Sequence, residues 1–137
     1  DTHDDQKSRL GTLLPNLDGM IGAIEAGLGP LWHNTVVVVA TEFGRAIRPN
    51  SSGGTDHGTA SVAMLLGGGV RGGRVISDWP GLALGTDREN AGLRGTLELE
   101  RLLASAAAAS LNLDPEFAMR TMFPALRAQA VENIFYR

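Results

Sequence analysis

The stretch Thr35 to Gly58, TVVVVATEFGRAIRPNSSGGTDHG, carries the strongest structural signal in the chain. Its consecutive valines, Val36 to Val39, make the run apolar at every position and not at every second one. This is typical of a strand covered on both faces, as in a parallel sheet between helix layers. Polar residues from Thr41 onward stand where this strand ends, and in open α/β sheets ligands bind beyond the carboxyl ends of the strands. We therefore expect an α/β fold whose site lies in residues 41–58.

The segments on either side of this stretch alternate between helix and strand patterns. Apolar residues recur every three or four positions from Leu10 to Leu28, which predicts one face of a helix. Pro15 is expected to kink this helix or to start a new first turn. Ala60 to Leu66 is a short apolar run, read as a second buried strand. The glycines from Gly67 to Gly69 indicate tight turns or a close backbone approach.

The C-terminal part of the sequence predicts two further helices after a polar loop from Gly85 to Gly95. One helix is expected from Thr96, a candidate N-cap, to Ser110. Asp114 followed by Pro115 is a strong start signal for the other, because aspartate caps the first turn and proline suits the first helical position. This last helix should end before Phe123.

Composition bounds the class of protein. The 137 residues suffice for a single domain, and a net charge of −3 with interspersed charges argues against binding to nucleic acid. The chain has no cysteine, so any metal must be held by histidine and carboxylate ligands. No apolar run reaches the roughly 20 residues of a membrane span. The chain opens on DTHDDQ, without a methionine or a signal peptide, and we expect it to be a fragment of a larger domain.

Two of the three histidines lie beside aspartates in loop-like segments. Imidazole and carboxylate together suit borderline divalent metals, and the spacing of Asp1 and His3 lets both face one side of an extended backbone. His57, in the Thr55 to Gly58 cluster, is a third candidate ligand. The alternative is that these residues are solvated or only support other ligands. His33, at the start of the valine strand, is read as structural or exposed.

Glu42 follows directly after the valine strand. A carboxylate there can be a metal ligand, a general base or an acceptor that holds a neighbouring loop. An ion pair with Arg45 or Arg48 is an equally open interpretation, and Arg45 could instead clamp an anionic substrate with its planar guanidinium. No activated nucleophile is indicated, because the loop hydroxyls lie outside any GxSxG elbow and are typical of turn caps: Ser51, Ser52 and Thr55.

Five motifs in order suggest a family. They are DTH (1–3), TVVVVATEFGR (35–45), GGTDHG (53–58), MLLGGGVRGGRV (64–75) and DWPGL (78–82). With these motifs the chain resembles the DUF1501 proteins, a bacterial family of sulfatase-like proteins in the alkaline phosphatase superfamily. The resemblance extends from Asp1 to about Phe123 and corresponds to the carboxyl-terminal part of such a protein.

The resemblance implies an alkaline phosphatase-like α/β/α sandwich with a mostly parallel sheet, and hydrolysis of a small anionic sulfate or phosphate ester. It implies a divalent metal such as zinc held by Asp1, His3 and His57, with the nucleophile upstream and a periplasmic or secreted location. Glu42 stands where the superfamily has a ligand aspartate. Phe43 stands where a ligand histidine is expected and cannot bind a metal, so we expect a single-metal or altered site.

Two readings of function follow. In the first, the chain is the carboxyl-terminal part of a metal-dependent ester hydrolase, with Glu42 and Arg45 assisting at the metal, and it is not active alone because it lacks the nucleophile. In the second, it is a non-catalytic binding or assembly protein with a degenerate metal site. A purely structural fragment is a third, weaker reading. A sheet that lacks its other half could also pair its edges with a second copy.

Overall fold

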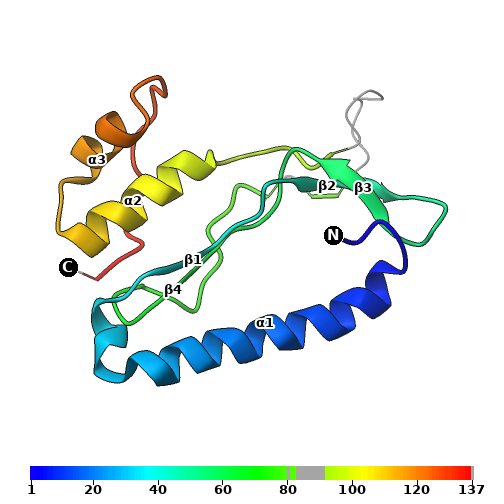
Figure 1. Ribbon diagram of the computed structural model, residues 1–137. Helices are drawn as coiled ribbons and strands as arrows, with labels where there is room; N and C mark the ends of the chain where they lie inside the picture. The colour runs from blue at the N-terminus through cyan, green and yellow to red at the C-terminus, as the bar shows by residue number, and fades with distance from the viewer. Residues whose placement is uncertain (80, 83–91, 137) are drawn as a thin grey trace. The chain divides into compact units, whose positions relative to one another are not determined.

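The computed structural model describes residues 1–79, 81–82 and 92–136 (Figure 1). Residue 80 of the DWPGL motif and most of the predicted loop 85–95 lie outside these ranges. The chain divides into two compact units. Unit 1 comprises Asp1–Leu28, Thr41–Val62 and Asp78–Gly95, and unit 2 comprises Gly29–Ala40, Ala63–Ser77 and Thr96–Arg137.

Unit 1 begins with a short extended segment and the long helix α1 (Gln6–Leu28). This confirms the helix predicted from Leu10, although it begins earlier, and it runs through Pro15 without a break. None of its side chains is buried, so its apolar stripe stays exposed to a large degree. Among the described residues, no helix combines the length and apolar character needed to cross a membrane, as the sequence predicted.

The remainder of unit 1 is built on an antiparallel hairpin. Strand β2 (Gly44–Pro49) pairs with β3 (Thr55–Gly58), with Arg45 opposite His57 and an irregular register towards Pro49. The N-terminal segment joins the hairpin loop through an isolated antiparallel bridge between Asp4 and Gly53. The N-terminal segment and the hairpin, which are distant in sequence, therefore meet at one place.

In unit 2 the valine run forms a strand that follows a short 3-10 helix. The helix η1 (Gly29–Asn34) leads to β1 (Val37–Val39), which pairs antiparallel with β4 (Met64–Leu66). The glycines after β4 make the predicted close approach, because a Cβ at Gly67 would overlap the Thr35 carbonyl and a Cβ at Gly68 would come within 2.7 Å of the His33 Cα.

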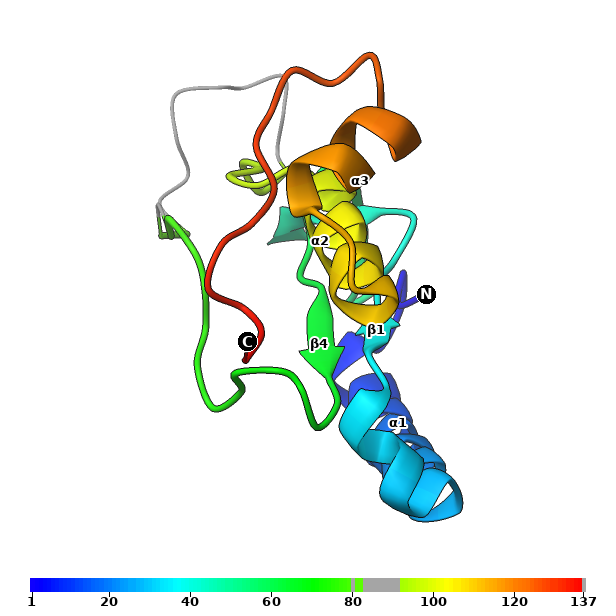
Figure 2. The ribbon, with the colours of Figure 1, turned by 90° about the vertical axis from the view of Figure 1, so that its left-hand side faces the viewer.

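The apolar core of unit 2 lies between α2 (Leu99–Leu111) and α3 (Pro115–Met122), which lie side by side in both ribbon views (Figures 1 and 2). Asp114 caps α3 by accepting a hydrogen bond from the Phe117 amide at 2.7 Å, as predicted. The N-cap of α2 is Glu98 rather than Thr96, and its side chain makes no capping bond. The core is small-residue packing around one methionine: Ala104, Ala108, Ala118, Met119 and Ala130.

The prediction of an α/β/α sandwich with a mostly parallel sheet is wrong. Within the described ranges, the strands form two separate two-stranded sheets, and both are antiparallel. A parallel return needs a crossover, usually through a helix. Residues 40–63, between β1 and β4, contain the β2–β3 hairpin instead. The valines of β1 are also only partly buried, so an unbroken apolar run did not indicate a strand covered on both faces.

Candidate metal centre

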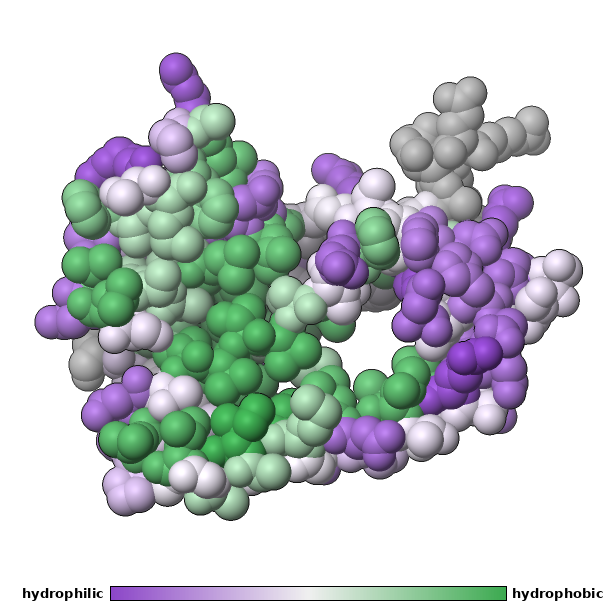
Figure 3. Space-filling model, viewed as in Figure 1, coloured by the Kyte–Doolittle hydropathy of each residue, from purple (hydrophilic) through white to green (hydrophobic). Residues whose placement is uncertain are grey.

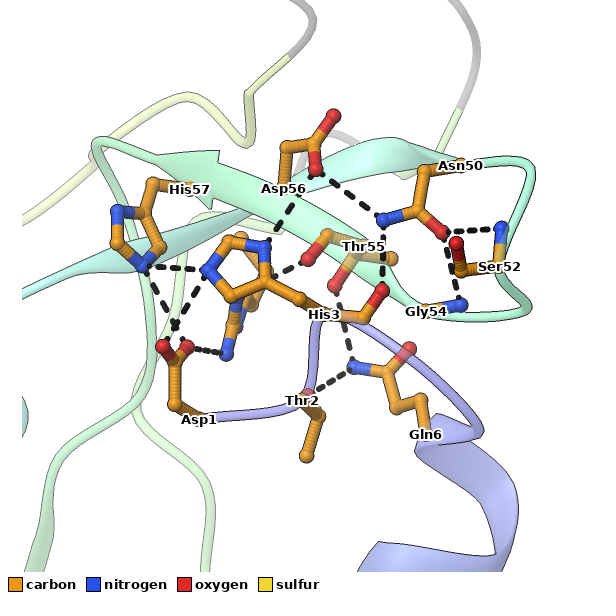
Figure 4. Close-up of polar contacts among 11 residues, drawn as sticks. Asp1, Thr2, His3, Gln6, Asn50, Ser52, Gly54, Thr55, Asp56 and His57 are labelled. Atoms are coloured by element: carbon orange, nitrogen blue, oxygen red, sulfur yellow. Dashed lines mark hydrogen bonds and ion pairs between the residues drawn. The ribbon is translucent and has the colours of Figure 1, made fainter.

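Three candidate ligands converge in unit 1, at the point where the N-terminal segment meets β3 (Figure 4). The Nε2 atoms of His3 and His57 are 3.0 Å apart. The Asp1 carboxylate lies 3.3 Å from His3 Nε2 through Oδ2 and 3.4 Å from His57 Nε2 through Oδ1. The predicted group Asp1, His3 and His57 is therefore brought together, and each residue offers one ligand atom to a common point.

This donor set fits a divalent metal such as zinc. In a tetrahedral site with zinc–nitrogen and zinc–oxygen bonds of about 2.0–2.1 Å, neighbouring ligand atoms lie about 3.3 Å apart. The two Nε2 atoms are 3.0 Å apart, and each has one or the other oxygen of Asp1 at 3.3 or 3.4 Å, so the donors lie close to that spacing. All three residues are exposed. One carboxylate and two imidazoles also leave room for a further ligand, as catalytic zinc sites do.

Backbone pairing explains how residues so far apart in sequence meet. The Thr55 amide donates to the Thr2 carbonyl at 3.2 Å, and the Gln6 amide donates to the Gly53 carbonyl at 3.1 Å. The Gln6 side chain reinforces this contact by donating to the hydroxyls of both Thr2 and Thr55. His3 lies between Thr2 and Gln6 in sequence, so these bonds hold it beside the start of β3, the strand that carries His57.

Glycines in the GGTDHG (53–58) and TVVVVATEFGR (35–45) motifs permit this close assembly. A Cβ at Gly54 would overlap the His3 carbonyl group, and one at Gly58 would lie 2.6 Å from the Arg45 carbonyl. A Cβ at Gly44, in the TEFGR motif, would overlap the Ala60 backbone. Because each neighbour is backbone rather than a flexible side chain, no rotamer change could relieve these overlaps. Gly44, Gly54 and Gly58 are therefore required by the close backbone packing around the site.

Arg45 contacts the cluster directly. Its guanidinium pairs with Oδ1 of Asp1 and donates to the Thr55 carbonyl at 3.0 Å. Its side chain is 24% exposed. Within the described residues, no ion pair joins Glu42 to Arg45 or Arg48, so the alternative interpretation of Glu42 as their partner finds no support. Arg45 instead orients a candidate ligand.

Phe43, at the position where the resemblance led us to expect a histidine, packs against the cluster. Its ring is stacked on the imidazole of His57, with centroids 4.5 Å apart and planes inclined by 15°. A flat aromatic contact of this kind restricts rotation of the imidazole. The residue that removes one potential ligand therefore helps to hold another.

Asn50 links the hairpin loop to the cluster. Its side-chain Nδ2 donates to the His3 carbonyl at 2.7 Å and to Asp56 Oδ1 at 3.1 Å. Asp56 Oδ1 also lies 3.5 Å from Nδ1 of His3. The Asn50 amide and, after it, the His3 imidazole lower the pKa of the Asp56 carboxyl, because their hydrogen bonds stabilise its charged form.

The other residues singled out in the sequence lie outside the cluster. Glu42 is exposed in the bend before β2 and is not among the described residues whose ligand atoms converge. Its role as a ligand or base stays a prediction. His33 is exposed in η1, as expected. Of the loop hydroxyls, Thr55 is buried and accepts from Gln6, and its role is structural.

Sequence reasoning missed the residues that support the ligands. Asn50 was passed over, although asparagine before a Ser-Ser-Gly-Gly run is a typical turn signal, and its Oδ1 accepts from the amides of Ser52 and Gly54. Asp56 was quoted only as part of a motif. No local signal could identify the Gln6 contacts, because they join residues that are distant in sequence.

Comparison with family profiles, curated proteins and solved structures tests the resemblance to the DUF1501 proteins. The profile of the DUF1501 family, described as a protein of unknown function, matches residues 1–109. The searches of curated proteins and of solved structures each returned no match. The matched segment contains all three candidate ligands and every motif on which the resemblance rests. Because the match covers most of the 137 residues, the chain belongs to the DUF1501 family.

Proposed function

We propose that this chain supplies the metal-binding part of a metal-dependent hydrolase that acts on sulfate or phosphate esters. One observation carries the proposal: the ligand atoms of Asp1, His3 and His57 lie within 4.8 Å of one another. The likeness of the motifs to sulfatase-like proteins supports the choice of ester, and the lack of cysteine restricts the ligands to these residue types.

The residues of the cluster have distinct roles in this proposal. A divalent metal bound by these residues would polarise an ester oxygen and would stabilise the negative charge that develops on it. Asp1, His3 and His57 hold the metal. Arg45 fixes the Asp1 carboxylate through their ion pair, and its positive charge beside the cluster favours an anionic substrate.

A second candidate function is a non-catalytic binding or assembly protein with an altered metal site. Phe43 is the observation in its favour, since it cannot bind a metal and stacks on His57 where the resemblance leads one to expect another ligand. In that case the metal would stabilise the junction of the N-terminal segment with the hairpin, and no ester would be hydrolysed.

The first test measures metal content by inductively coupled plasma mass spectrometry after incubation with zinc and desalting. We expect close to one metal per chain in the wild type and little retained metal in His57→Ala, since one of three protein ligands is removed. His33→Ala is the matched control, because His33 is also exposed but lies outside the cluster. Circular dichroism must show that all three proteins are folded.

Two outcomes would contradict the metal assignment. One is a folded wild-type chain that binds no zinc, manganese or cobalt. The other is an equal loss of bound metal in His33→Ala and His57→Ala. To separate hydrolase from non-catalytic protein, aryl sulfate and aryl phosphate are offered to the chain and to a longer protein that contains it. The hydrolase reading expects turnover only in the longer protein, because the resemblance puts the nucleophile upstream, and that turnover should be lost in His57→Ala.

A further inference from the structure

The two histidines of the cluster are held in different ways. Both imidazole side chains are 44% exposed, but the His57 ring stacks on Phe43, whereas His3 has polar contacts at both ring nitrogens and a tilted contact with the His57 ring. The His3 Nε2 faces Asp1 and His57, and its Nδ1 faces Asp56 (Figure 4). A half-exposed imidazole is not fixed by packing alone. Whatever orients it must therefore be found among those contacts.

We propose that Asp56, held by Asn50, is a positioning residue that keeps the proton of His3 on Nδ1 and presents Nε2 to the metal. This inference rests on the proposed metal site. Histidines that bind metals commonly donate their other ring N–H to a carboxylate, which fixes the tautomer and the ring orientation and increases the basicity of the ligand. Asp56 Oδ1, 3.5 Å from Nδ1, stands on the side of the ring opposite to the cluster.

Asn50 makes this arrangement specific. Asp56 is 71% exposed, so without a partner its carboxylate would be free to turn into solvent. The Asn50 Nδ2 donates both to Asp56 Oδ1 and to the backbone carbonyl of His3. The Asn50 side-chain amide thus holds both Asp56, the acceptor, and His3, the residue that Asp56 orients. The Asn50 Oδ1, in turn, is fixed by the amides of Ser52 and Gly54 at 3.0 Å each.

A contact at Nδ1 has a chemical consequence at Nε2. A neutral imidazole carries one proton, so a carboxylate that accepts from Nδ1–H leaves Nε2 unprotonated and able to bind a cation. If Asp56 were absent, the proton could move to Nε2, where His57 Nε2 at 3.0 Å or the Asp1 carboxylate at 3.3 Å would accept it. That tautomer would block the metal-binding nitrogen of His3. Asp56 on one side of the ring therefore competes with His57 and Asp1 on the other for one proton, and Asn50 favours Asp56.

The experiment compares three variants of the full chain with the wild type. Asp56→Ala removes the acceptor, and Asp56→Asn keeps a neutral oxygen that Nδ1–H can reach. Asp4→Ala removes an equal charge from a neighbouring exposed aspartate, whose side chain pairs with Arg9 instead. Zinc affinity is measured by competition with a chromogenic chelator. The tautomer of His3 is measured separately, without metal, from the nitrogen chemical shifts of the imidazole at a pH where it is neutral.

We expect Asp56→Ala to lose about 10- to 100-fold in zinc affinity, Asp56→Asn to lose less, and Asp4→Ala to bind like the wild type. Without metal, the His3 proton should move from Nδ1 towards Nε2 in Asp56→Ala only. A tautomer that is the same in the wild type and Asp56→Ala overturns the inference, whether or not zinc binds. A wild type that binds no zinc but shows the tautomer shift would instead refute the metal site and leave the positioning role standing.

Discussion

The candidate ligand cluster of unit 1 (Asp1, His3 and His57) and the helical core of unit 2 are held together by different forces. Hydrophilic residues gather over β2 and β3, and hydrophobic ones over α2 and α3 (Figure 3). The core is centred on Met119, which is 1% exposed and surrounded by buried alanines. The cluster has exposed ligands, and its order comes from backbone hydrogen bonds, side-chain amides and glycines in tight contact.

This difference predicts which substitutions each region tolerates. Apolar packing is non-directional, so its loss should scale with the volume removed. A hydrogen-bonded junction depends on position, so a single added methyl group can separate its segments. The core should thus be sensitive to large-to-small changes and the cluster to small-to-large changes.

The largest effect is expected for Gly54→Ala. Its Cβ would overlap the His3 carbonyl group, so the N-terminal segment must move away from the hairpin, at a local cost that should exceed the roughly 1–3 kcal/mol of ordinary overpacking. Metal binding, measured by mass spectrometry, should be lost although no ligand is changed. Gly19→Ala is the control, because nothing lies within 4 Å of its Cβ position in α1. Retained stoichiometric metal in Gly54→Ala would contradict this account of the motif.

The second prediction concerns the core. Met119→Ala should lower the free energy of unfolding by about 2–5 kcal/mol, since it leaves a cavity between α2 and α3. Met122→Ala, in the same helix but 44% exposed, should cost less than about 1 kcal/mol. Urea denaturation followed by circular dichroism measures both. Equal losses in the two variants would mean that the core does not lie where the burial of Met119 indicates.

A smaller effect is expected at the start of α3. Asp114→Ala removes the acceptor for the Phe117 amide and should cost about 1 kcal/mol, as for other helix N-caps. Asp114→Asn keeps a capping oxygen and should restore most of that loss. If asparagine were no better than alanine in thermal unfolding, the cap would contribute through something other than its hydrogen bond.

The smallest effect is expected for Glu42→Gln. Its exposed carboxylate lies outside the group of convergent ligand atoms. Zinc affinity should therefore fall by less than about 10-fold, the smallest loss typical of residues that support a metal ligand. The chelator competition used for Asp56→Ala gives the comparison. A loss as great as that of His57→Ala would restore Glu42 to the ligand set and show that the site rearranges when metal binds.

Patterns within a few residues predicted much of the local structure. The period of α1 and the Asp114–Pro115 start of α3 were confirmed, because helix hydrogen bonds and caps join residues that are neighbours in sequence. The parallel sheet was wrong, because the valine run shows that β1 is apolar but contains no information about its partner or their relative direction. In the structure β1 pairs antiparallel with β4, and the β2–β3 hairpin lies between them in sequence.

The sequence by itself determined which residue types could hold a metal, because without cysteine only histidines and carboxylates have the chemistry. Only the tertiary structure decided that Asp1, His3 and His57 converge while Glu42 and His33 do not. It also showed that Arg45 forms an ion pair with Asp1 and that Asn50 donates hydrogen bonds to Asp56 and to the His3 carbonyl. The physical reason is that donor chemistry belongs to a side chain, whereas a separation of 3 Å between ligand atoms depends on backbone pairing between distant segments, which no local pattern encodes.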